Sequence, residues 1–373
     1  MIRLFSRDAA QPPPTEENSA ASEPLALLAA VADALPDPFL LLNRDGHVAI
    51  ANRAADEVFE TQLTGKHISH AVRSPVILDA VQEVIAHRDP LRVDFEQRIP
   101  LERRFEASIA PLAKSDSALP ERPAIIILFR DLTREQQLER MRADFVANAS
   151  HELRTPLASL LGFIETLQGA AKNDSSARER FLILMRTQAE RMARLIDDLL
   201  SLSRIELNAH RRPTSIVDLE PLIRQAVEML QPSAAEAGVE INLAVSGDLH
   251  APGDRDELIQ VFQNLVENAI KYASAGKRVD ITAGRDAAGR LEVAVADYGP
   301  GIAADDIPRL TERFYRVSVQ ESRARGGTGL GLAIVKHILN RHRAKLIITS
   351  EPGKGSTFTV RLPGEPEKRA EHQ

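Results

Sequence analysis

Residues 145–167 read FVANASHELRTPLASLLGFIETL, and this stretch decides how the middle of the chain folds. Its apolar residues recur at spacings of three and four, and those of residues 182–199 do the same, which is typical of a coiled-coil seam. The polar segment 172–176 separates the two runs. Because two antiparallel helices cannot bury such stripes alone, we expect pairing with a second copy into a four-helix bundle. The sequence therefore predicts a homodimer.

The histidine of this stretch lies off the seam. Leu153 and Leu157 belong to the seam, so the His151 imidazole can face solvent. Thr155 follows one turn later on the same face. Pro156 has no N–H and costs a helix about 3 kcal/mol, so a bend is expected beside it. From these residues alone, a functional bend and a tolerated kink both stay open.

The C-terminal half alternates helical and extended patterns, which predicts a two-layer α/β sandwich. The expected strands are 239–245, 278–284, 291–297, 345–349 and 357–362. One expected helix begins at Asp254 and carries polar residues at i, i+3, i+4 and i+7, which share one face. They are Asn264, Glu267, Asn268 and Lys271. A solvated face with an ion pair is the plain interpretation, but asparagines are poor helix formers and their amide oxygens suit Mg²⁺.

Two glycine-bearing loops follow. Asp297-Tyr298-Gly299-Pro300-Gly301-Ile302 comes directly after an expected strand, where a carboxylate can accept from an adenine amino group while glycines allow close approach. Residues 326–332 read GGTGLGL and lead into an apolar helix, whose free N–H groups suit phosphate oxygens. No Gly-Lys-Ser/Thr follows, so this is not a P-loop.

Taken in this order, the motifs resemble the conserved boxes of bacterial sensor histidine kinases of two-component systems, in particular the phosphate-regulon type. The resemblance covers about residues 134–363. It implies a dimeric antiparallel helical hairpin and an ATP-binding α/β sandwich of the kind shared with gyrase and heat-shock chaperones, in an α+β multidomain chain. It further implies ATP and Mg²⁺ as cofactors, and a separate response regulator as phosphoryl acceptor.

The resemblance also implies a role for each matching residue. His151 is the expected phosphoacceptor, Glu152 its base, and Thr155 the residue that holds a water for regulator phosphatase activity. Asn268 is the expected Mg²⁺ ligand. The expected ATP-binding residues are Asn264, Asn268, Lys271, Tyr272, Asp297, Gly299, Gly301, Ile302, Tyr315, Arg316, Gly327, Thr328, Gly329, Leu330, Gly331, Leu332 and Thr357. Residues 303–327 are expected to form a mobile lid over the nucleotide.

The N-terminal region predicts a small α+β domain. An Asp-Gly turn at residues 45–46 joins two apolar runs, as in a β-hairpin, and Asn52 can cap a helix that runs through Phe59. Strands are expected at 91–95, 105–109 and 124–129. The region resembles a PAS domain that ends in the junction Asp131-Leu132-Thr133. The expected domains are a disordered leader (1–24), a PAS-like sensory domain (25–133), a dimerisation and phosphotransfer hairpin (134–210), a catalytic domain (211–365) and a tail (366–373).

Composition excludes some classes of protein. The net charge of −6 gives no reason to expect direct nucleic-acid binding, and the absence of cysteine excludes disulfides and thiolate metal sites. Charged residues and prolines interrupt the most apolar stretch, 25–42, so no transmembrane segment is expected. A cytoplasmic protein, with any membrane association through partners, is predicted. Two rival hypotheses are an ATPase of the same nucleotide fold without phosphohistidine, and a scaffold that recruits a regulator without catalysis.

Overall fold

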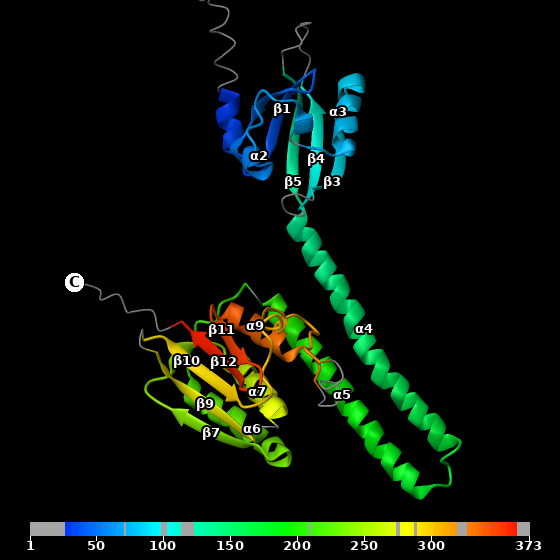
Figure 1. Ribbon diagram of the computed structural model, residues 1–373, viewed down its shortest axis with the longest axis vertical. Helices are drawn as coiled ribbons and strands as arrows, with labels where there is room; N and C mark the ends of the chain where they lie inside the picture. The colour runs from blue at the N-terminus through cyan, green and yellow to red at the C-terminus, as the bar shows by residue number, and fades with distance from the viewer. Residues whose placement is uncertain are drawn as a thin grey trace, which may run out of the picture. The chain divides into compact units, whose positions relative to one another are not determined.

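The computed structural model describes residues 27–363, except for 71, 98–102, 113–122, 209, 274–276, 287–288 and 319–326 (Figure 1). Two compact units divide between Asp144 and Phe145, inside helix α4 (Thr133–Gln168). The predicted domain border at 133/134 coincides with the start of this helix. The border between the two compact units lies further along the chain, because the first turns of the continuous helix α4 belong to the first unit and the rest to the second. The expected leader and tail lie outside the described residues. Among the described residues, no helix is both long and apolar enough to cross a membrane.

The first unit contains a five-stranded antiparallel sheet in the order β2-β1-β5-β4-β3. The predicted hairpin is confirmed, with Gly46 at a φ of +78° in its turn. The three later strands also form where alternation placed them, although each extends beyond its expected bounds. The strands are β1 (Phe39–Asn43), β2 (Val48–Ala51), β3 (Leu91–Gln97), β4 (Arg103–Pro111) and β5 (Pro123–Asp131).

A buried asparagine organises the start of this unit. Asn52 is fully buried, and its side-chain oxygen accepts from the N–H groups of Phe39 and Ala55, both at 2.9 Å. It therefore caps α2 (Arg53–Val58), as the sequence predicts. Helix α3 (Pro75–His87) packs on the same core. At the centre of that core, four aromatic rings contact one another; they are Phe59, Phe95, Phe105 and Phe129.

The end of the first unit is joined to α4 by hydrogen bonds. The Thr133 N–H donates to the Asp131 carboxylate at 2.8 Å, and the Arg104 N–H donates to the Thr133 hydroxyl at 3.0 Å. The Leu132 N–H donates to the Arg104 carbonyl at 2.8 Å. The Asp-Leu-Thr junction thus fixes the first residue of α4 against strand β4.

Helix α4 and helix α5 (Ser175–Leu207) form the predicted hairpin, and Asp174 caps α5 through the Ala177 N–H. Helix α4 continues through Pro156. Large apolar side chains on both helices stay exposed in the single chain, because a hairpin has only one partner for each stripe. Within the second unit they are Val146, Leu157, Leu161, Ile164, Leu182, Ile183, Leu184, Ile196, Leu200 and Leu207.

The rest of the second unit is the predicted α/β sandwich. Its sheet has the order β11-β12-β10-β9-β7, and helices α6 (Leu219–Ala237), α7 (Arg255–Tyr272) and α9 (Gly331–Arg341) pack against one face (Figure 1). Strand β10 alternates buried and half-buried residues, as expected when only one face is covered. The strands are β7 (Glu240–Val245), β9 (Arg278–Arg285), β10 (Leu291–Asp297), β11 (Lys345–Glu351) and β12 (Gly355–Leu362), with a small separate pair, β6 (Ile216–Asp218) and β8 (His250–Pro252).

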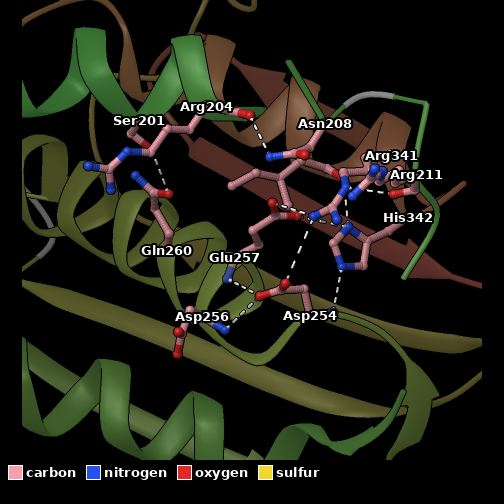
Figure 2. A network of polar contacts seen from close by, with 11 residues as sticks. Ser201, Arg204, Asn208, Arg211, Asp254, Asp256, Glu257, Gln260, Arg341 and His342 are labelled. Carbon is pink, nitrogen blue, oxygen red and sulfur yellow. Dashed lines mark hydrogen bonds and ion pairs between the residues drawn. The ribbon is translucent and has the colours of Figure 1, made fainter. Parts of the chain in front are cut away.

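A polar network joins the C-terminal end of α9 to the linker that follows α5 (Figure 2). The Arg341 Nε donates to the Arg211 carbonyl at 2.8 Å. Its guanidinium also forms an ion pair with Glu257 and lies 3.9 Å from the Asp254 carboxylate. One side chain therefore holds the linker and the first turn of α7 together.

The neighbouring histidine completes this attachment. His342 is buried, its Nε2 accepts from the Asp254 N–H at 3.0 Å, and its Nδ1 contacts the Ile338 carbonyl at 2.8 Å (Figure 2). Burial lowers the pKa of His342, which favours the neutral imidazole that can accept at Nε2. Helices α7 and α9 are thereby fixed to each other at this end.

Candidate functional site

Helix α7 presents the predicted polar face. Asp254 caps the helix by accepting from the N–H groups of Asp256 and Glu257, as expected. Further along, Lys271 and Glu267 form an ion pair at 2.8 Å, so the plain interpretation of this face is correct for that pair. The helix thus places amide and charged groups in one row, beside the start of α9.

The asparagine amides are disposed differently from each other. The Asn264 amide donates to the Gln260 carbonyl at 2.9 Å, while the Asn268 side chain is half-buried and has no hydrogen bond to any described residue. No cluster of three or more His, Cys, Asp or Glu side chains suited to a metal is found in the described part of the chain. A Mg²⁺ ion held by one amide oxygen, phosphates and waters fits these residues, because Mg²⁺ keeps few protein ligands at nucleotide sites.

Asp297 ends strand β10 as a buried carboxylate, 6% exposed. It accepts from the Gly299 N–H at 2.9 Å. Burial raises the pKa of Asp297, and backbone hydrogen bonds from Gly299 and Ser356 oppose that rise. A buried acceptor of this kind can select a ligand that brings its own N–H donor, as the adenine amino group does.

The glycines of the first loop allow close backbone contacts. A Cβ on Gly299 would lie 2.2 Å from the Tyr272 carbonyl oxygen, at the end of α7. Gly301 has a φ of +71°, and a Cβ there would lie 2.1 Å from the Glu351 carbonyl oxygen. The next residue, Ile302, donates its N–H to the Ser350 hydroxyl at 2.8 Å. The loop is therefore held between α7 and the β11–β12 turn.

The second loop leads into α9. A Cβ on Gly331 would lie 2.7 Å from the Asn264 Oδ1, so this glycine brings the start of α9 against α7. Leu330 is the N-cap residue and offers no side-chain cap, which leaves helical N–H groups free for an anion. Leu332 packs against the core. Gly327, Thr328 and Gly329 precede the helix, and the Thr328 hydroxyl accepts from the Leu330 N–H at 3.3 Å.

Tyr315 and Arg316 lie before the loop. The Tyr315 hydroxyl donates to the Asp306 carboxylate at 2.5 Å, which raises the pKa of Tyr315. The Arg316 side chain is 4% exposed and donates to the Thr328 carbonyl at 2.8 Å and to Glu152 at 3.0 Å. Residues 319–326 of the expected lid lie outside the described residues.

The phosphoacceptor candidate lies on α4, beside this site. His151 is exposed, and the next residue, Glu152, accepts from Arg316 and from Arg191 at 3.2 Å. Thr155 is exposed, and its hydroxyl donates to the His151 carbonyl at 3.2 Å. The structure thus brings the predicted base, Glu152, into contact with Arg316, one of the predicted ATP-binding residues.

Strand register distinguishes the predicted residue Thr357 from its neighbour Ser356. Asp297 is paired with Ser356 in the β10–β12 ladder, while Thr357 is opposite Ala296. Because side chains alternate along a strand, Thr357 faces away from Asp297, and the buried Ser356 lies on its side of the sheet. Alternation within GSTFTV, whose Phe358 and Val360 are core residues, could have indicated this. A hollow of about 370 Å³ beside Thr357 and Asp297 has no lining residue from α7 or the second loop, so we do not assign it to the nucleotide.

The sequence did not predict Asp198 as part of this site. Its carboxylate, on α5, accepts from the Thr328 hydroxyl at 2.7 Å. Burial raises the pKa of Asp198, with the Thr328 hydrogen bond opposing. No motif marks this residue, since 130 positions separate it from its partner.

Comparison with known families matches both halves of the second unit. Residues 141–208 match the His Kinase A (phospho-acceptor) domain. Residues 253–366 match the family of histidine kinase-, DNA gyrase B- and HSP90-like ATPases.

Similar proteins include sensor kinases with established names. The phosphate regulon sensor protein PhoR of Pseudomonas aeruginosa is 37% identical over 329 residues, which cover 87% of this chain and 72% of that protein. The sensor-like histidine kinase SenX3 of Mycolicibacterium smegmatis is 38% identical over 248 residues, 66% of this chain and 64% of that protein. The solved structure of Acinetobacter baumannii histidine kinase AdeS has 26% identity and a TM-score of 0.46, covering 58% of this chain and 98% of that one. By sequence identity and coverage, the chain belongs to the PhoR-type sensor histidine kinases of two-component systems.

Proposed function

We propose that this histidine kinase transfers the γ-phosphoryl group of Mg²⁺-bound ATP to His151. The observation that supports the proposal most directly is the contact between Glu152, beside the exposed His151, and Arg316 of the nucleotide-binding domain. The adenine amino group is assigned to Asp297, the metal to Asn268, and the phosphates to Lys271, Arg316 and the N-terminus of α9.

In the proposed step, a neutral His151 nitrogen attacks the γ-phosphorus as the bond to the β,γ-bridging oxygen breaks. The bonding electrons leave with ADP, and Glu152 takes the imidazole proton. A bound Mg²⁺ would neutralise charge on the phosphate oxygens. Positioning and charge neutralisation supply most of the rate enhancement in phosphoryl transfer, and Arg316 and Lys271 provide positive charge for it.

The test is His151→Gln, with labelled ATP and an acid-lability assay. The variant should lose the acid-labile label and bind ATP nearly as the wild type does, because its nucleotide contacts come from α7, the two loops and α9. Acid-stable label on the variant would contradict the assignment. Hydrolysis of ATP by wild type without phosphohistidine would instead support the rival ATPase hypothesis.

We also propose a homodimer that buries the exposed apolar residues of the hairpin. Leu157, Leu161 and Ile164 on α4 recur at i, i+4 and i+7, and Ile196 and Leu200 on α5 are one turn apart. Such stripes are rarely left in water and match the seam of a four-helix bundle.

The further proposals concern signalling. A response regulator would take the phosphoryl group on an aspartate, and Thr155, next to His151 on an exposed face, would hold the water for regulator dephosphorylation. The antiparallel sheet of the first unit is consistent with a PAS-like sensory domain whose junction at Thr133 passes signals to α4. The cytoplasmic location stays a prediction.

A further inference from the structure

Two carboxylates of the helical hairpin contact the nucleotide-binding domain: one holds Arg316, which the proposed function assigns to phosphate, and the other holds Thr328, in the loop just before the N-terminus of α9. Glu152 on α4 accepts from Arg316 at 3.0 and 3.4 Å. Asp198 on α5 accepts from the Thr328 hydroxyl at 2.7 Å. Arg316 in turn donates to the Thr328 carbonyl at 2.8 Å, so the two contacts form one connected set.

The surroundings make these contacts stronger than ordinary surface pairs. The Arg316 side chain is 4% exposed and that of Glu152 is 15% exposed, and charge-assisted hydrogen bonds strengthen as water is excluded. Asp198 is half-buried, and it interacts electrostatically with Glu267 and Lys271 of α7. A carboxylate of the hairpin therefore lies within the electrostatic reach of the phosphate-binding face.

We propose that Asp198 weakens binding of ATP relative to ADP, because its carboxylate competes with the γ-phosphate of ATP for Thr328 while Glu152 competes for Arg316. This inference rests on the proposed function and describes how the same site is regulated. A γ-phosphate that captures Arg316 removes that guanidinium from Glu152. Losing a nearby cation makes the Glu152 carboxylate a stronger base toward the proton of His151. Binding of ATP and activation of the base are thus one event.

ADP has no γ-phosphate, so it leaves Arg316 on Glu152. We expect the hairpin contacts to persist with ADP and to break with ATP. Asp198 then weakens ATP binding more than ADP binding, and it holds the kinase in the state of this structure until ATP arrives.

The first test is Asp198→Asn, which keeps the shape and removes the charge. The matched control is Asp197→Asn, an exposed neighbour on the same helix with the same change of net charge. Equilibrium binding by displacement of a fluorescent nucleotide should show about tenfold tighter ATP binding in Asp198→Asn, with a change below about threefold for ADP. ATP and ADP affinities equal to those of Asp197→Asn would overturn the proposal.

The second test does not depend on binding energies. The chain has no cysteine, so Asp198→Cys combined with Thr328→Cys gives two unique thiols for a short bis-methanethiosulfonate cross-linker. The intrachain cross-link should form without nucleotide, persist with ADP, and be suppressed by a non-hydrolysable ATP analogue. Equal suppression of the cross-link by ADP and by the ATP analogue would overturn the proposed competition. So would the absence of any cross-link in a double variant that unfolds at the wild-type temperature. If the wild-type protein formed no phosphohistidine with ATP, only the proposed function would be contradicted, because neither of these two tests measures phosphorylation.

Discussion

Replacing Asp297 by asparagine should weaken the recognition of adenine without lowering the stability of the fold. The Asp297 carboxylate is 6% exposed and accepts from the Gly299 N–H. An asparagine keeps the size of the side chain, but it presents an amide in place of the second acceptor oxygen. The adenine amino group would then lose its partner in a site that water cannot easily reach.

An unpaired buried donor costs about 1–3 kcal/mol, which corresponds to a rise in Kd for ATP of about five- to 150-fold. The free energy of unfolding should not fall together with the affinity for ATP. Burial raises the pKa of Asp297 above its ordinary value of 3.8, so the folded state binds the proton more tightly than the unfolded state. The carboxylate therefore costs stability as pH rises from the ordinary value through the raised pKa, and the cost is fully present above that range. At pH 7, Asp297→Asn should be as stable as wild type or more stable.

The assay is calorimetric titration with ATP and with inosine triphosphate, whose 6-oxo group replaces the amine, together with thermal unfolding at pH 7. We expect the variant to lose its preference for ATP over inosine triphosphate. Wild-type ATP affinity would refute the adenine role. Weak binding of both nucleotides with a lowered Tm would show instead that Asp297 is structural.

The other predictions concern the phosphatase, the linker and the dimer. Thr155→Ala should keep autophosphorylation while slowing decay of phosphorylated regulator by about tenfold or more; equal decay rates with wild type would place this activity elsewhere. Arg341→Met should lower the free energy of unfolding by about 3 kcal/mol in urea titrations, because it leaves the half-buried Glu257 carboxylate without that cation. The control is Arg224→Met, which removes the cation of the exposed ion pair with Glu220 and should cost below about 1 kcal/mol. Equal losses of stability in the two variants would contradict the argument. Leu161→Glu should halve the mass measured by light scattering, and a dimer that persists at micromolar concentration would rule out this stripe as the interface.

Local patterns predicted much of the fold, since the strands and the caps at Asn52 and Asp254 depend on neighbours a few residues away. Residues brought together from distant segments carried no such signal. Asp198 and Thr328 meet only once α5 packs on the nucleotide-binding domain. The face of the sheet on which Thr357 and Ser356 lie is also hard to predict, because one residue of register moves a side chain to the other face.

The arrangement of α7 and α9 restricts where regulation can act. At one end Gly331 packs against Asn264, and at the other Arg341 and His342 hold the first turn of α7. A pair of helices fixed at both ends cannot easily change its polar face, so ATP meets a preformed surface. The contacts of Arg316 and Thr328 with the hairpin are the ones that a phosphate can replace with equivalent hydrogen bonds. We therefore expect a signal that shifts the hairpin to act most readily by altering the hold of Glu152, on α4, and of Asp198, on α5, on those two groups.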